Sequence, residues 1–258
     1  MVAAKRILWV GGALAAGVVA VVVALLLGIR HEARKTAPPT EPVPIEVVEP
    51  PPVATEVPFS SPRLAGVTLA ASDPLVRELV ARLSSHPQLV SWLVTEELVR
   101  RFVVAVHSAA RGLSPREQLD FALPEEPFRV HRRGGKLLVD PVCYHRYDLA
   151  AEVFTSLDTA GSVALYRELG PLIAEAHREI AGPGESFDVT LRAAISELLA
   201  TPTLEGDVEV SQKVVTFSFV DEQLEQLSAA QRHFLRMGPV NVGRVQAKLE
   251  ELDAALRR

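Results

Sequence analysis

Cysteine, tryptophan, methionine and tyrosine are all scarce in this chain of 258 residues. The only cysteine is Cys143, so no intrachain disulfide is possible and cysteine pairing says nothing about the redox compartment. His145 lies two positions further on, but two residues at that spacing on a helix point in different directions. We therefore interpret Cys143 as a small buried residue rather than as half of a Cys/His nucleophilic pair.

No stretch of the chain concentrates charge of one sign. Lysine and arginine together number 27, against 32 aspartate and glutamate residues, and the net charge is −5. A protein that binds nucleic acid normally carries a concentrated basic surface that neutralises phosphates. The charge distribution therefore argues against nucleic acid as a partner.

The sequence also lacks the short motifs that carry catalysis, metal binding or nucleotide binding. It contains no HExxH, GxSxG, SxxK, Walker or dinucleotide-binding signature. Its seven histidines are scattered, and none of them pairs with another at the spacing of metal ligands. We therefore expect no metal ion and no cofactor, and the sequence alone identifies no catalytic residue.

One apolar run, from Ile7 to Ile29, is the strongest feature of the sequence, because its 23 residues include no charge and no proline. A helix of that length measures about 34 Å, which matches a hydrocarbon core of about 30 Å with some tilt. A cleaved signal peptide would have a shorter apolar region and a cleavage site in a non-basic setting. Here Arg30, Arg34 and Lys35 follow the run. The sequence predicts an uncleaved transmembrane helix at residues 7–29, with the lipid bilayer as a partner.

The flanks of this helix carry similar numbers of basic residues, so they do not fix its orientation by themselves. The tail formed by residues 1–6 is short and basic, which favours the cytoplasm for that end. Long domains that follow a first helix cross the membrane largely regardless of charge. We expect a single-pass protein whose C-terminal domain lies outside the cytoplasm.

A linker at residues 30–71 separates the apolar run from the rest of the chain. Within it, Thr36 to Pro62 holds nine prolines in 27 residues, with four glutamates and no basic residue. Proline fixes φ and lacks a backbone donor, so a packed element is excluded there. In extended polyproline geometry this stretch reaches roughly 80 Å, which predicts a stiff spacer.

Residues 72–258 contain repeated helix starts and stops, as expected of one globular domain. Capping residues followed by apolar positions at helical spacing mark the starts, and Pro171 is expected to break a long helical pattern. The stretch from Phe102 to Val106 is apolar almost all round, which predicts a central helix. Helices are expected to begin near Ser72, Pro87, Ser114, Asp140, Asp148, Asp158, Ser186 and Ser228, and the helix that carries Leu98 and Phe102 is expected to be capped by Thr95.

One β-hairpin stands out among these helices. Phe128–Arg132 and Lys136–Val139 flank Gly134 and Gly135, which supply the positive φ angles of a tight turn. Weak alternation from Val208 to Val220 predicts one or two further strands. The expected fold class is α+β, mainly α, with an N-terminal transmembrane helix, a proline-rich linker and one helical domain that carries a small β-hairpin or sheet.

Several motifs in the second half of the chain occur in one order, and together they resemble a bacterial family known only as domain of unknown function 3014. The resemblance covers roughly residues 72–256 and implies an N-terminal membrane anchor and a proline-rich spacer. Since members occur in proteobacteria, it also implies an inner-membrane anchor and a periplasmic domain. It implies no activity and no catalytic residue. The motifs are Arg146–Asp148, Ser156–Asp158, Val163–Leu169, Leu198–Pro202 and Leu235–Pro239 followed by Asn241.

The densest polar and aromatic cluster is Tyr144, His145, Arg146, Tyr147 and Asp148, which holds two of the three tyrosines. At the start of a helix pair, such a cluster is a candidate groove or partner site. In the alternative interpretation, Arg146 pairs with Asp148 to fix the junction, and the tyrosines pack half-buried.

The last two helices carry a second candidate site, in which Arg232 and Arg236, and then Arg244 and Lys248, are spaced four residues apart. A basic face of this kind would meet an anionic partner or lipid headgroups. The alternative is an ordinary solvated helix face. Asn241 is expected to cap the last helix.

The last helix also places five apolar residues at heptad spacing. This stripe predicts either packing on the helix's own domain or the seam of a homodimer. Its members are Val242, Val245, Leu249, Leu252 and Leu256.

We expect a non-enzymatic, membrane-tethered envelope module that acts as an interaction or scaffold domain and binds a protein partner or itself. One alternative is a periplasmic enzyme, most plausibly a hydrolase, with a site assembled from distant residues such as His145, Asp148 and Glu175. The other is a sensor domain that binds a small ligand.

Overall fold

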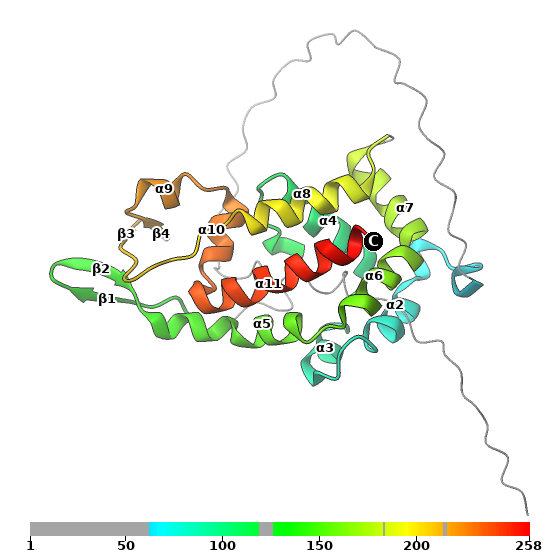
Figure 1. Ribbon diagram of the computed structural model, residues 1–258, viewed down its shortest axis with the longest axis horizontal. Helices are drawn as coiled ribbons and strands as arrows, with labels where there is room; N and C mark the ends of the chain where they lie inside the picture. Colours follow the sequence, from blue (N-terminus) through cyan, green and yellow to red (C-terminus); the bar gives the residue numbers. More distant parts are fainter. Residues whose placement is uncertain (1–61, 119–125, 183, 214–215) are drawn as a thin grey trace, which may run out of the picture.

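Helices dominate the structure, and two short antiparallel sheets lie together at one end of the helical body (Figure 1). The computed structural model describes residues 62–118, 126–182, 184–213 and 216–258. The predicted transmembrane helix at residues 7–29 and the linker as far as residue 61 lie outside the described residues. Within the described ranges, no helix combines the length and apolarity needed to cross a bilayer.

The elements follow the order predicted from the helix starts and from the hairpin. Short 3-10 helices, labelled η, precede or connect several of the α-helices. The bounds in chain order are η1 Pro62–Leu64, η2 Leu69–Ala71, α2 Asp73–Val80, α3 Pro87–Trp92, α4 Leu98–Ala110, η3 Arg116–Gln118, β1 Val130–Arg133, β2 Lys136–Val139, η5 Pro141–Tyr147, α5 Asp148–Thr155, α6 Thr159–Glu168, α7 Gly170–Ala181, α8 Phe187–Leu199, β3 Val210–Gln212, β4 Phe217–Phe219, α9 Glu222–Glu225, α10 Ala229–Leu235 and α11 Gly238–Leu256.

Helix α4 is central, as its nearly uniform apolar stretch predicted. It packs most extensively against α8 and α7, and Phe102, Val103, Ala105 and Val106 are completely buried. Burial of a large apolar side chain stabilises a fold by about 1.5–3 kcal/mol relative to leaving it exposed. The main core therefore forms around this helix.

Helix α11 closes the other side of the core by packing against α5, α6, α8 and α10. Four residues of its heptad stripe are buried, and Leu256 packs on the same core while partly exposed. The interpretation that this stripe packs on the helix's own domain is confirmed, because the domain covers it. Its buried members are Val242, Val245, Leu249 and Leu252.

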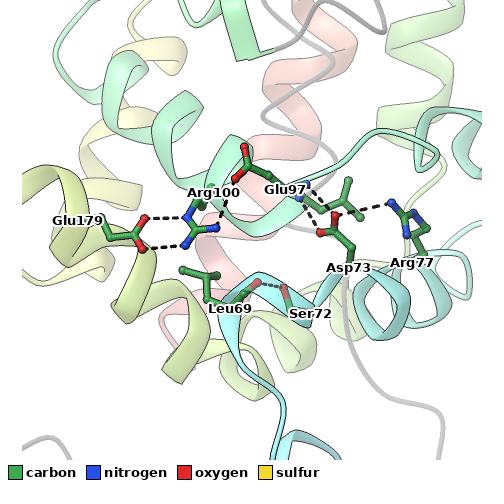
Figure 2. Close-up of polar contacts among 8 residues, drawn as sticks. Leu69, Ser72, Asp73, Arg77, Glu97, Arg100 and Glu179 are labelled. Atoms are coloured by element: carbon green, nitrogen blue, oxygen red, sulfur yellow. Dashed lines mark hydrogen bonds and ion pairs between the residues drawn. The ribbon is translucent and has the colours of Figure 1, made fainter.

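The start of α4 is capped from another helix, so the prediction that Thr95 caps it is wrong. Asp73 of α2 accepts hydrogen bonds from the backbone N–H groups of Glu97 (2.7 Å) and Leu98 (3.0 Å), as Figure 2 shows. Glu97, the residue before the helix, has a left-handed backbone with φ of 57°. A carboxylate near a helix N-terminus satisfies orphan N–H groups and complements the helix dipole.

A second polar contact ties α4 to α7. The guanidinium of Arg100 donates from Nε and Nη2 to the two carboxylate oxygens of Glu179, over 2.8 and 2.9 Å (Figure 2). Glu175 and Glu179 are exposed on α7 while His177 is buried, so the two glutamates share a face and the histidine points elsewhere.

The two sheets are each two-stranded and antiparallel. In the predicted hairpin, Val130 faces Val139, and both turn glycines have positive φ. Strands β3 and β4 pair so that Val210 faces Phe219, and the N–H of Val139 donates to Val208 O over 2.9 Å between the sheets. A second, smaller core lies beneath them, formed by Val139, Cys143, Leu204, Val208, Val210 and Leu235.

Candidate functional site

The sequence-predicted cluster Tyr144–Asp148 lies where η5 passes into α5, and both elements pack against α11. We call this segment the 144–148 junction. The hairpin leads directly into η5. Asp140 caps the start of η5, because its Oδ1 accepts a hydrogen bond from the N–H of Val142 over 3.0 Å. The carboxylate of Asp148 lies in the first turn of α5, where the helix dipole favours a negative charge.

Asp148 makes one hydrogen bond within the junction and one to α11. Its Oδ2 is 2.9 Å from His145 Nδ1, and its Oδ1 accepts from Asn241 Nδ2 over 2.8 Å. The buried Asn241 amide also donates to Tyr144 O (3.3 Å) and to Met237 O (3.2 Å). The prediction that Asn241 caps the last helix is wrong, because α11 already begins at Gly238 and Asn241 connects two elements instead.

These contacts set the charge state of Asp148. Burial acts to raise the pKa of this carboxyl, but the hydrogen bonds from Asn241 and His145, together with the charges of His145 and Arg244, outweigh burial and hold the pKa below its usual range. Asp148 is therefore ionised near neutral pH.

Arg146 does not pair with Asp148, contrary to one interpretation of the sequence. Its Nη1 donates to Glu126 O over 3.1 Å, and its Nη2 lies 3.3 Å from the hydroxyl of Tyr147. The guanidinium carbon also lies 5.5 Å from the ring centre of Phe128 and 4.9 Å from that of Tyr147, within cation–π range. Arg146 thus fixes the hairpin onto the junction.

The two tyrosines differ in burial. Tyr147 is completely buried, which raises the pKa of its phenol, while Tyr144 is half-buried, and burial raises its pKa to about 12. The expectation of two half-buried tyrosines is correct for Tyr144 only. Both phenols remain neutral at physiological pH.

Exposed apolar and basic side chains flank Asp148 and Asn241 along η5, α5 and α11. Val142 and His145 are three residues apart on η5, and side chains at that spacing on a 3-10 helix lie one above the other. Leu149, on α5, follows His145 by four residues, the spacing at which helical side chains are neighbours. On α11, Val240 and Arg244 lie one turn apart on either side of Asn241. We call these five residues the outer face; the exposed fractions of Val142, Leu149 and Val240 are 59%, 43% and 72%.

The predicted basic face of the last two helices does not form as one surface. Lys248 is buried, and its Nζ donates to Thr159 Oγ1 over 2.7 Å and to Glu251 Oε2 over 3.0 Å. Arg232 donates to the backbone oxygens of Glu225 and Leu227. Arg244 is exposed and belongs to the outer face.

On its other side, the junction borders a cleft between the two sheets and α10, which we call the sheet cleft. The cleft is narrow, because only about 20 Å³ of it can hold the centre of a water molecule. Arg236, which follows the end of α10, lines it, and burial lowers the pKa of this guanidinium. The other lining residues are Phe128, Val139, Tyr144, Leu204, Val210, Phe217, Ser218, Phe219 and Leu235.

The residues of the alternative hydrolase site are not brought together. His145 and Asp148 contact each other at the junction, but Glu175 lies on α7, where its charge acts on Arg100. Figure 1 shows α7 at the opposite end of the helical body from the hairpin and the start of α5.

Comparison with known proteins identifies a family. Residues 98–253 match the model of a family described as "Protein of unknown function (DUF3014)". No curated protein and no solved structure matches the chain. The matched segment begins at the first residue of α4 and ends within α11, so it contains the 144–148 junction, both sheets and the sheet cleft.

Proposed function

Since the chain belongs to the DUF3014 family, whose function is unknown, we propose from its own geometry that it is a non-enzymatic interaction module. The outer face is the observation that carries this proposal. Val142, Leu149 and Val240 expose apolar side chains, and His145 and Arg244 are exposed on the same elements. Apolar surface with a polar rim, held on rigid helices, is typical of a surface that binds another protein.

The predicted N-terminal segments add a location to this proposal. A transmembrane helix at residues 7–29 tethers the module to the bacterial inner membrane, with residues 1–6 in the cytoplasm and the domain in the periplasm. The proline-rich linker allows the outer face to meet partners up to roughly 80 Å from the bilayer. The partner is then a protein of the cell envelope or a second copy of this chain.

Site-specific photo-crosslinking in intact cells tests the outer face. A benzophenone amino acid is placed at Val240 in the full chain, and the matched control carries it at Val189 of α8, which is 69% exposed. We expect a discrete crosslinked product from position 240 that position 189 does not give. Its mass distinguishes a partner from a second copy. Equal crosslinking from the two positions, or none from position 240, would contradict the proposal.

Fusion of alkaline phosphatase or of a fluorescent protein to the C-terminus tests the proposed location. Phosphatase is active outside the cytoplasm, so we expect an active fusion that sediments with membranes. A fluorescent cytoplasmic fusion, or recovery of the native chain in the soluble fraction, would contradict the tether.

A further inference from the structure

We infer that a cleft between α6 and α8 binds a small α-amino acid through both of its charged groups. This inference goes beyond the proposed function, because the cleft lies at the end of α11, about 24 Å along that helix from Val240 of the outer face. It rests on the charges that line the cleft, on their lack of partners and on the size of the cleft.

The cleft forms where the last residue of α11 meets α6 and α8, and the label C in Figure 1 marks this end of α11 beside α6. We call it the α6–α8 cleft. Leu191, which is buried, and Leu256, which is partly exposed, form its apolar part. The complete lining is Tyr166, Arg167, Asp188, Leu191, Arg192 and Leu256.

Two guanidinium groups supply a binding site for a carboxylate. Arg167 comes from α6 and Arg192 from α8, and both side chains are exposed at the cleft. Among the residues that the structure describes, neither guanidinium forms a hydrogen bond or an ion pair. Guanidinium groups bind carboxylates through charge-assisted hydrogen bonds, often two at a time. The carboxylate of a ligand would therefore meet two cations that are not already paired.

Asp188 supplies a binding site for an ammonium group. Its Oδ1 accepts a hydrogen bond from the hydroxyl of Tyr166, which is only 8% exposed, so the Asp188 carboxylate is held at the cleft from below. Asp188 and Arg192 are four positions apart on α8, where side chains are neighbours, yet they form no ion pair with each other. A ligand that carries both charges would satisfy the two side chains at once.

The mixed charge of the cleft favours such a ligand over a simple anion or cation. A carboxylate alone would lie beside Asp188, and an ammonium alone would lie beside Arg167 and Arg192, so each would meet a like charge.

The size of the cleft limits the ligand to a small amino acid. About 70 Å³ of the cleft can hold the centre of a water molecule. On that measure one water needs about 10–15 Å³, so roughly five waters fit. That space is enough for the two charged groups of an amino acid and a methyl side chain, which Leu191 and Leu256 can contact.

Saturation-transfer NMR, observed on the ligand, measures the dissociation constants of three probes with the full chain in detergent. The probes are L-alanine, propanoate, which lacks the ammonium group, and ethylammonium, which lacks the carboxylate. The variants are Asp188→Asn and Arg192→Gln. Arg178→Gln is the matched control, because Arg178 is exposed on α7 and lines no part of the cleft.

We expect L-alanine to bind at least about fivefold more tightly than propanoate or ethylammonium, because each of these probes loses one charged contact. Arg192→Gln should weaken the binding of alanine and leave that of ethylammonium nearly unchanged. Asp188→Asn should weaken the binding of alanine and not that of propanoate. Arg178→Gln should behave as the wild type.

Circular dichroism shows whether the two cleft variants fold. If either does not fold, the comparison of the three probes on the wild type decides the question alone. Equal affinity for alanine and either single-charge probe, or no saturation transfer to alanine at millimolar concentration, overturns the inference. None of these results bears on the outer face, which the crosslinking experiment tests separately.

Discussion

The ring of Tyr144 lies directly against the backbone of Gly238, so that a Cβ atom on this glycine would come within 2.4 Å of the ring carbon Cγ. The glycine also has φ of 79°, a left-handed conformation that other residues adopt at a cost. Through this contact η5 packs against the first turn of α11. The contact also explains why a glycine precedes Pro239.

Substitution of this glycine should strongly destabilise the domain. We expect Gly238→Ala to lower the free energy of unfolding by about 2–4 kcal/mol, through steric overlap with Tyr144 and backbone strain. Gly243→Ala is the matched control in the same helix, because nothing lies within 4 Å of its added Cβ. The control should gain up to about 1 kcal/mol from helix propensity. Urea unfolding measures both, and equal effects would contradict this account.

The Asn241–Asp148 hydrogen bond should also contribute measurably to stability. We expect Asn241→Ala to cost about 1–3 kcal/mol, because a buried donor is removed from three acceptors. Asn241→Asp should cost more at pH 7, because it faces the ionised Asp148. Adding Asp148→Asn should then recover part of the loss. A double-mutant cycle by urea unfolding checks this, and a coupling energy near zero would exclude the interaction.

The same contact should make the free energy of unfolding fall in acid. The pKa of Asp148 is lowered in the folded state, so its contribution is complete above the ordinary carboxyl pKa and is lost as pH falls through the folded value. Unfolding measured between pH 7 and pH 3 should show a smaller acid loss in Asp148→Asn than in the wild type. An identical pH dependence would show that this carboxyl is not responsible.

Two substitutions at the start of α4 should change the stability of the domain in opposite directions. Asp73→Ala removes the cap that Figure 2 shows and should cost about 0.5–2 kcal/mol. Glu97→Gly relieves a left-handed backbone at a non-glycine residue and should gain up to about 1 kcal/mol. Thermal unfolding measures both changes, and a loss in Glu97→Gly would mean that its weak contact with Arg100 matters more than the strain.

His107 should make the domain less stable in mild acid. Burial, followed by the charges of His177 and Arg111, lowers the pKa of His107 below its ordinary 6.5, while Glu185 opposes the shift. The unfolded chain therefore binds a proton more readily, and stability should fall as pH drops below 6.5. The rings of His107 and His177 lie 5.8 Å apart, and His177 also contacts Phe187 and Thr190. His107→Phe should flatten the stability profile between pH 7 and pH 5, and an unchanged slope would contradict this.

Features set by neighbouring residues could be predicted from the sequence. The hairpin turn at Gly134 and Gly135 formed as expected, and Pro171 separates α6 from α7 because it cannot continue the helical ladder. Ser228 caps α10 through a complete capping box. In each case the controlling contacts span only a few residues.

Features set by distant residues could not be predicted. Asp73 reaches the start of α4 across 24 positions, so the nearby Thr95 was wrongly chosen as the cap. Asn241 donates a hydrogen bond to Asp148, which lies 93 positions away in the chain, and no local sequence pattern predicts such a pair. The cluster at 144–148 was found from its composition, but Val240 and Leu149 of the outer face are ordinary apolar residues until the fold places them beside it.

The position of α11 in the chain has a consequence for biosynthesis. The apolar sides of α5, α6 and α8 are covered by a helix that is made last among the described elements. At about 5–20 residues per second, α5 leaves the ribosome roughly 5 to 20 seconds before α11 is complete. The core between α11 and these helices therefore cannot be completed during that interval, a delay that suits a domain proposed to cross a membrane before it folds.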